Sequence, residues 1–113
     1  MIERGEIWWA ELQLPAGSEP GYRRPILIVQ SNDFNKSCIH TIAALAITSN
    51  PKLADDPGNN LLPKNMTGLS SDSVANLSQF ITMDKRFLSG RLKRLPAIVM
   101  RRIDAGIRPA LSV

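Results

Sequence analysis

The chain has 113 residues, of which 43% are hydrophobic and 21% charged, and its net charge is +4 at neutral pH. This length predicts a single domain over residues 1–113 with a modest core, and the composition is that of an ordinary soluble globular protein. No apolar run approaches the roughly 18 residues of a membrane span and the N-terminus lacks the layout of a signal peptide, so we expect a cytoplasmic protein without a membrane partner.

The first half of the chain predicts three strands. Glu6–Leu12 is rich in aromatic and apolar residues, which favours a first strand. A long loop follows over residues 13–24, punctuated by two prolines and two glycines. Residues 25–30 predict a buried strand that begins at Pro25, where a backbone donor can be spared. After a polar turn at 31–37, residues 39–48 predict a third strand, although their alanines leave a helix as the alternative.

The second half predicts short strands and one helix. After a loop at 49–60, apolar pieces occur at 60–63, 73–77, 80–83 and 87–92, a spacing that favours a small barrel over a parallel sheet. Beyond Pro96, apolar residues recur every four positions, which predicts a helix that packs on the barrel. These residues are Val99, Ile103, Ile107 and Leu111. We therefore predict a mainly β fold, a small β-barrel with a C-terminal α-helix.

The loop before the second strand holds the most suggestive group of charges. Glu19 precedes Arg23 and Arg24, and a wholly apolar run follows Pro25. Loops held by a rigid scaffold often carry function, and an arginine fork is a natural partner for a phosphate. The alternative is a solvated loop with an ordinary charge pair.

Positive charge is concentrated at the C-terminal end. Residues 85–113 contain eight Lys or Arg residues and one acidic residue, Asp104, which gives this segment a charge of +7 and leaves −3 for residues 1–84. Such asymmetry favours a polyanion or an acidic partner, with a solvated basic helix face as the alternative.

The single cysteine and the single histidine limit the chemistry that is available. Cys38 allows no intramolecular disulfide, and with His40 it gives no zinc-like spacing. We expect no metal and no cofactor, and we expect Cys38 to be a small buried hydrophobe. Catalysis within one subunit would depend on arginine, hydroxyl, carboxylate or lysine groups.

Several short motifs together resemble one protein family. They are Arg-Gly-Glu-Ile-Trp (4–8), Gly-Ser-Glu (17–19), Arg-Pro-Ile-Leu-Ile-Val (24–29) and Ala-Ile-Thr-Ser-Asn (46–50), continued by Asp-Ser-Val (72–74), Gln79, Thr82 and Asp-Lys (84–85). In order and spacing they resemble the MazF/PemK (Kid) toxins over essentially the whole chain. The resemblance implies an SH3-like β-barrel with helices, as in the MazF and CcdB toxins. It also implies a homodimer that pairs with a cognate antitoxin and contacts operator DNA only through the antitoxin complex.

The activity that the resemblance implies is metal-independent, sequence-specific cleavage of single-stranded RNA, mostly mRNA. The ribose 2′-OH attacks, leaving a 2′,3′-cyclic phosphate and a 5′-hydroxyl, so the protein supplies positioning, charge stabilisation and proton transfer. Arg24 and Thr48 match the family pattern and are the expected catalytic pair, with Glu19 as the candidate base because arginine stays protonated. The expected RNA-binding residues are Ser18, Arg23, Asn35, Ser49, Asn50 and Gln79.

Some positions depart from the family pattern. Asn76 and Ser78 stand where some members carry an arginine and an aspartate, and Ile81 replaces an arginine. Trp8 and Trp9 are candidate stacking platforms for bases, although a first-strand position favours a core role for at least one of them.

Two other functions compete with RNA cleavage. A CcdB-like gyrase inhibitor has the same fold but relies on a C-terminal Trp-Gly-Ile, whereas this chain ends in Ala-Leu-Ser-Val (110–113). The other alternative is a non-catalytic SH3-like nucleic-acid-binding module.

Overall fold

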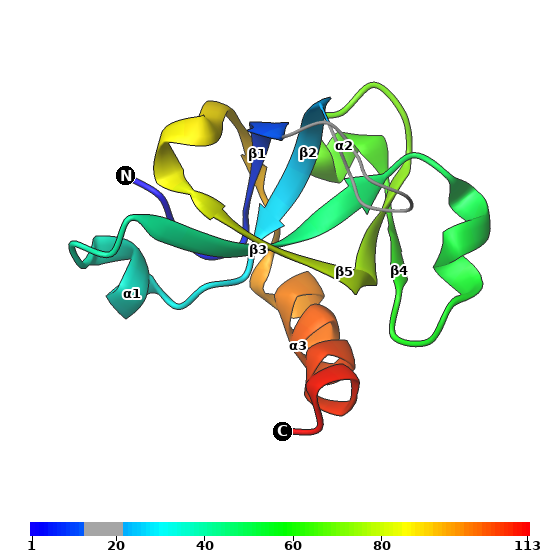
Figure 1. Ribbon diagram of the computed structural model, residues 1–113. Helices are drawn as coiled ribbons and strands as arrows, with labels where there is room; N and C mark the ends of the chain where they lie inside the picture. The colour runs from blue at the N-terminus through cyan, green and yellow to red at the C-terminus, as the bar shows by residue number, and fades with distance from the viewer. Residues whose placement is uncertain (13–21) are drawn as a thin grey trace.

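The computed structural model of the protein describes residues 1–12 and 22–113, and within them the strands form one antiparallel sheet with a longer helix at the C-terminus (Figure 1). The strands are β1 (Glu6–Leu12), β2 (Tyr22–Ile28), β3 (Thr41–Thr48), β4 (Asn60–Leu62), β5 (Ser73–Asp84) and β6 (Leu88–Arg94). The helices are α1 (Asn32–Lys36), α2 (Lys64–Thr67) and α3 (Ala97–Leu111), with 3-10 turns η1 (Pro51–Asp55) and η2 (Lys85–Phe87). The strand order is β4-β5-β3-β2-β1-β6.

The sheet is strongly curled. Its two edges are β4 and β6, yet α2, which follows β4 closely in the chain, packs against β6. Lys93 of β6 donates a hydrogen bond from Nζ to the carbonyl oxygen of Asn65 in α2, at 2.7 Å. The curl therefore brings the two edges toward each other, with α2 bridging them.

Two hydrophobic clusters cover the two faces of the sheet. Val99, Met100 and Ile103 of α3 pack on one face, together with buried residues of every strand except β6. On the opposite face a smaller cluster contains Ala10, Ile26, Ile28, Ile42, Ala44 and Met83. Burying apolar side chains on both faces explains why β2 and β3 read as nearly continuous hydrophobic runs.

Figure 1 shows α3 extending away from the sheet, with the C-terminus at its far end. Among the described residues, the structure contains no helix that meets the length and apolarity of a membrane span.

Most predicted elements are confirmed, with shifted bounds. The mainly β fold with a C-terminal helix is present, and residues 41–48 form a strand rather than a helix. The pieces predicted at 73–77 and 80–83 belong to one strand, β5. In the predicted stripe of α3, Val99 and Ile103 are buried, whereas Leu111 is half exposed.

The prediction that Cys38 is buried is wrong. Its side chain is exposed, with a free thiol. The residue lies in the short link between α1 and β3, where residues 36–41 are all exposed. The apolar neighbour Ile39 suggested burial, but Ile39 is itself 42% exposed.

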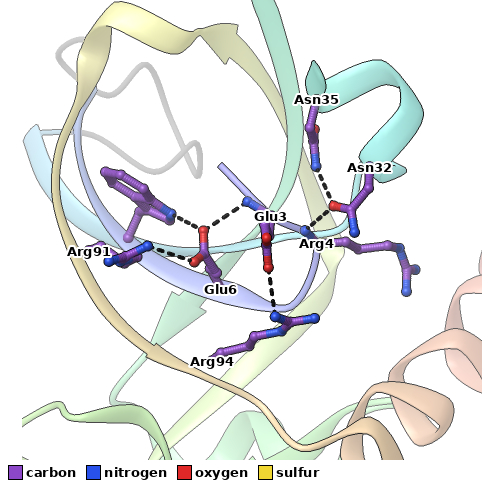
Figure 2. Close-up of polar contacts among 8 residues, drawn as sticks. Glu3, Arg4, Glu6, Asn32, Asn35, Arg91 and Arg94 are labelled. Atoms are coloured by element: carbon purple, nitrogen blue, oxygen red, sulfur yellow. Dashed lines mark hydrogen bonds and ion pairs between the residues drawn. The ribbon is translucent and has the colours of Figure 1, made fainter. Parts of the chain in front are cut away.

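A polar network fixes the N-terminal segment to β6 (Figure 2). The carboxylate of Glu6 is nearly fully buried and accepts hydrogen bonds from the backbone N–H of Glu3 at 2.8 Å and from Trp8 Nε1 at 3.1 Å. Arg91 of β6 donates to the other carboxylate oxygen at 3.3 Å. Arg94 pairs with Glu3 at 2.6 Å. A buried carboxylate is tolerated when it is paired and hydrogen-bonded in this way.

Candidate active site

Arg23 and Arg24 are strand residues rather than loop residues. The sequence suggested that the strand begins at Pro25, but β2 begins at Tyr22 because Leu12 of β1 already pairs with that residue. In the same ladder Glu11 opposes Arg23 and Ala10 opposes Arg24. Successive side chains of a strand point to opposite faces, so the two arginines do not form one guanidinium pair.

Arg23 lies on the face that carries Trp9 and Glu11. Its guanidinium lies over the Trp9 ring, 4.3 Å from the centroid, and Nε is 3.8 Å from a carboxylate oxygen of Glu11. Both charged side chains are more than half exposed. Trp8 packs instead against the cluster on the other face and bonds the buried Glu6. The face of the Trp9 ring is therefore in contact with the guanidinium of Arg23, and Trp8 packs in the core.

Arg24 shares the other face with Thr48. The pairing of β2 with β3 ends where Ile26 opposes Ala46. Arg24 lies two residues before Ile26 and Thr48 two residues after Ala46, so each projects from the same face of its strand as that pair. Cross-strand partners project from the same face, so both side chains continue the row of Ile26 and Ala46 beyond the end of the apolar cluster. The expected catalytic pair thus lies beyond the point at which β2 and β3 stop pairing with each other.

The hydroxyl of Thr48 is held by the turn that follows β3. Thr48 Oγ1 accepts a hydrogen bond from the backbone N–H of Asn50 at 3.2 Å. Asn50 Oδ1 in turn accepts from the N–H of Lys52 at 3.1 Å and caps η1. Because the hydroxyl acts as an acceptor toward Asn50, its own proton can be donated to a phosphate oxygen. Ser49, between them, is exposed.

A bulge in β5 places polar groups beside this pair. Leu45 opposes Phe80 while the next residue, Ala46, opposes Asn76, so residues 77–79 have no counterparts in β3. Gln79 lies in this bulge and is half-buried. Bulges disrupt a ladder locally and often re-aim side chains next to active sites. Arg24, Thr48 and Asn76 thus belong to three adjacent strands, β2, β3 and β5.

Asn76 departs from the family pattern, and the sequence motifs do not single it out as a site residue. It is 4% exposed, and its Oδ1 accepts from Ser78 Oγ at 2.8 Å and from the Ser78 N–H at 3.1 Å. The only sequence signal was a polar pair, Asn76 and Ser78, next to an apolar strand. That signal does not reveal the bulge.

Asn35 is not brought to this cluster. It is 6% exposed and donates from Nδ2 to the carbonyl of Gln30 and to Asn32 Oδ1, at 3.0 and 3.2 Å. α1 follows the C-terminal end of β2 and precedes the start of β3, which is the end of this strand pair remote from Arg24 and Thr48. Glu19 and Ser18 lie outside the described residues.

The described part of the cluster combines a cationic side chain with hydroxyl and amide groups. Among residues 1–12 and 22–113, no group of three or more His, Cys, Asp or Glu side chains could hold a metal ion. The described groups match what phosphodiester cleavage by a neighbouring hydroxyl requires, since the substrate supplies the nucleophile and the site must hold and neutralise a phosphate.

Comparison with known proteins decides the family. The family model described as "PemK-like, MazF-like toxin of type II toxin-antitoxin system" matches residues 3–111. The chain belongs to this family. The resemblance of its sequence motifs to the MazF/PemK toxins is thereby confirmed.

Individual members of the family are similar over their full length. The chain is 43% identical to the endoribonuclease MazF6 of Mycobacterium tuberculosis over 113 residues, which cover 100% of this chain and 99% of that protein. A crystal structure of MazF from Deinococcus radiodurans matches with a TM-score of 0.81 at 25% identity, covering 99% and 97% of the two chains. An endoribonuclease from a mycobacterial species, solved in complex with its cognate antitoxin, matches with a TM-score of 0.79 at 19% identity, covering 100% and 97%. The last likeness supports the MazF fold.

Proposed function

We propose that this member of the PemK/MazF family is the toxin of a type II toxin–antitoxin pair and cleaves single-stranded RNA without a metal ion. The observation that supports the proposal is that Arg24 and Thr48 continue the face of Ile26 and Ala46 on two adjacent strands, in a chain 43% identical to a named endoribonuclease.

The reaction follows from the groups present. The ribose 2′-oxygen forms a bond to phosphorus, the bond from phosphorus to the 5′-oxygen breaks, and the products carry a 2′,3′-cyclic phosphate and a 5′-hydroxyl. Arg24 binds the non-bridging oxygens as negative charge develops on them. Thr48 donates its hydroxyl proton to a phosphate oxygen or orients the attacking group. Because arginine stays protonated, we assign the removal of the 2′-OH proton to Glu19, while the 5′-oxygen leaves with a proton from an acid or from water.

The remaining expected binding residues receive more specific roles in this proposal. Ser49 and Asn50 extend from Thr48 along the turn before η1, and Gln79 extends from the bulge, so these side chains flank the cleaved bond. Ser18 would act beside Glu19, and Arg23 would contact the RNA backbone from the opposite face of β2.

We further propose a homodimer that acts in the cytoplasm and is blocked by an antitoxin with an acidic tail. The charge of +7 on residues 85–113 supports an acidic partner. A tail that orders on binding would combine charge attraction with burial of apolar groups. Operator DNA would be contacted only through the antitoxin complex.

The decisive experiment incubates the purified protein with a long single-stranded RNA in EDTA and maps both ends of each product. Arg24→Ala and the near-isosteric Thr48→Val are tested in parallel. Arg102→Ala, which removes the same charge from an exposed position on α3, serves as the matched control. Discrete cuts with cyclic-phosphate ends, lost in the first two variants and kept in the control, are expected. Intact RNA from a folded, dimeric wild type would overturn the proposal and direct attention to gyrase inhibition or to binding without chemistry.

A further inference from the structure

The chain leaves β3 through a short turn whose conformation is restricted by its sequence, Thr-Ser-Asn-Pro-Lys (48–52). Pro51 disfavours a helical conformation at the residue before it, and Asn50 is accordingly extended, with φ −80° and ψ 105°. Pro51 then begins η1, where a backbone donor is not needed. The N–H groups of Asn50 and Lys52 both donate to side-chain oxygens. The turn therefore depends on its own side chains for two of its hydrogen bonds.

Asn50 is bonded through three of its groups. Its backbone N–H donates to Thr48 Oγ1 at 3.2 Å, and its Oδ1 accepts from the N–H of Lys52 at 3.1 Å. Its carbonyl oxygen accepts from the N–H of Leu53 at 3.2 Å. These bonds hold the main chain and the side chain of Asn50 together, so the cap on η1 sets the direction in which the Asn50 N–H points.

The far end of η1 is anchored to β5 by Asn59. Asn59 Nδ2 donates to the carbonyl oxygen of Leu53 at 2.8 Å, and Asn59 Oδ1 accepts from the N–H of Leu77 at 2.8 Å. Leu77 is buried and packs against Gly106 of α3. Because η1 is held at both ends, the hydrogen bond from Asn50 to Thr48 starts from a fixed support.

This support acts on the hydroxyl of Thr48. A hydroxyl has one proton and two lone pairs, and its proton turns to suit the surrounding groups. The N–H of Asn50 occupies one lone pair, so the proton of Thr48 points away from the turn. Donors that already point to the place where charge develops stabilise a transition state better than donors that must first reorient.

The side chain of Asn50 could assist RNA cleavage in two ways, and the two ways use different atoms. A positioning role requires only Oδ1, which accepts from Lys52. Direct contact with RNA would use the Nδ2 donor of this exposed side chain. The bonds of the turn involve Oδ1 and the backbone of Asn50, which favours the positioning role.

We propose that Asn50 is a positioning residue for RNA cleavage and acts through Thr48 rather than through contact with the RNA. Its Oδ1 caps η1, and the cap directs the Asn50 N–H onto Thr48 Oγ1, so that Thr48 donates its proton to the phosphate. This proposal rests on the proposed function. It gives Asn50 a role that differs from the RNA contact expected from the sequence.

The test compares kcat and KM on one short RNA that contains the mapped cut site. Asn50→Ala removes the cap and should lower kcat about tenfold, a moderate case of the loss that misplacing a reacting group causes. KM should stay within about twofold of the wild-type value, because the lost interaction acts only in the transition state. Asn50→Ser restores a neutral capping oxygen without the amide N–H₂, and kcat should return to within about twofold of the wild type.

The matched control is Asn65→Ala, the same change at an exposed position of α2. The main-chain carbonyl of Asn65, which receives Lys93, is kept in this variant. Its kcat and KM should equal those of the wild type.

A double-mutant cycle with Thr48→Val tests whether Asn50 acts through the Thr48 hydroxyl. Thr48→Val removes the group that Asn50 positions, so adding Asn50→Ala should lower kcat by less than about twofold further. Direct contact between Asn50 and RNA would instead make the two effects multiply. Single-turnover kinetics measure the cleavage step in these slow variants.

The possible outcomes separate this proposal from the one on which it rests. A wild type that cuts no RNA overturns both. If the wild type cuts RNA, effects of Asn50→Ala and Thr48→Val that multiply, or an Asn50→Ser as slow as Asn50→Ala, overturn only the positioning role and assign Asn50 to RNA contact. A folded Asn50→Ala with the wild-type kcat also overturns it. Thermal melting confirms folding, and Asn50→Gly, which also lacks the capping oxygen, replaces Asn50→Ala if that variant is unfolded.

Discussion

The side chain of Leu77 lies against Gly106, so closely that a Cβ added to Gly106 would stand 2.3 Å from Leu77 Cδ1 and 2.8 Å from the carbonyl oxygen of Gly58. This contact joins the bulge of β5 to α3. The position of Gln79 and Asn76 therefore depends on a glycine in a helix some thirty residues further along the chain.

Gly106→Ala should destabilise the protein by about 2 kcal/mol, as expected for overpacking in a filled interior. The clash involves the backbone of Gly58 as well as a side chain, so it cannot be relieved by a rotamer change alone. Urea denaturation would measure the loss. Gly90→Ala is the matched control, since its Cβ would meet only Trp9 Cδ1 at 3.8 Å. Equal stability of the two variants would contradict the packing described here.

The arrangement of Arg23 and Arg24 on opposite faces predicts unequal effects of their removal. Arg24→Ala should lower kcat for RNA cleavage by about 10²–10³, the usual cost of losing one group that stabilises transition-state charge. Arg23→Ala should mainly raise KM, because this residue would contact RNA without touching the reacting phosphate. Steady-state kinetics on one RNA would separate the two effects. Equal losses of kcat would show that both arginines act at the phosphate.

The buried carboxylate of Glu6 should be sensitive to an isosteric change. Glu6→Gln replaces one acceptor oxygen by an N–H₂ group that faces existing donors, and we expect a loss of about 2 kcal/mol. Tryptophan fluorescence would report both the unfolding transition and the altered environment of Trp8, which donates to this carboxylate. Glu11→Gln, whose partner Arg23 is 3.8 Å away on an exposed surface, should cost well under about 1 kcal/mol.

Because Cys38 is exposed, we predict that its thiol reacts rapidly with thiol reagents. One equivalent of a thiol reagent should react with the native protein without denaturant, because the side chain is exposed. Cys38→Ser should remove the reaction and leave RNA cleavage unchanged. A thiol that reacts only after unfolding would show that Cys38 is buried in the folded protein, as the sequence suggested.

The general fold could be predicted because its elements have strong local signals. The apolar runs of β2 and β3 and the four-residue spacing of Val99 and Ile103 in α3 each suggest the element that the structure contains. Strand ends were less predictable. β2 starts before Pro25 because β1 offers partners as far as Tyr22, and such a tertiary partner leaves no mark on the local sequence.

The site was predictable only in part, for a similar reason. Family motifs indicate Arg24 and Thr48, which lie on adjacent strands just beyond the pair Ile26 and Ala46. The bulge of β5 could not be predicted from the sequence, because residues 77–79 resemble a break between two separate strands. Consequently the sequence marks Asn76 only as a position that lacks the family's arginine, and it suggests a pair of Arg23 and Arg24 that the alternation of β2 separates.

The excess of three residues in β5 also limits how this protein can be altered. Deleting residues 77–79 would allow β5 to pair with β3 without the register shift, and the sheet would gain regular hydrogen bonds. The same deletion would erase Gln79 and the buried Leu77 that joins β5 to α3. A redesign that rewards regular geometry would therefore lose a core contact together with the irregularity on which the chemistry is proposed to depend.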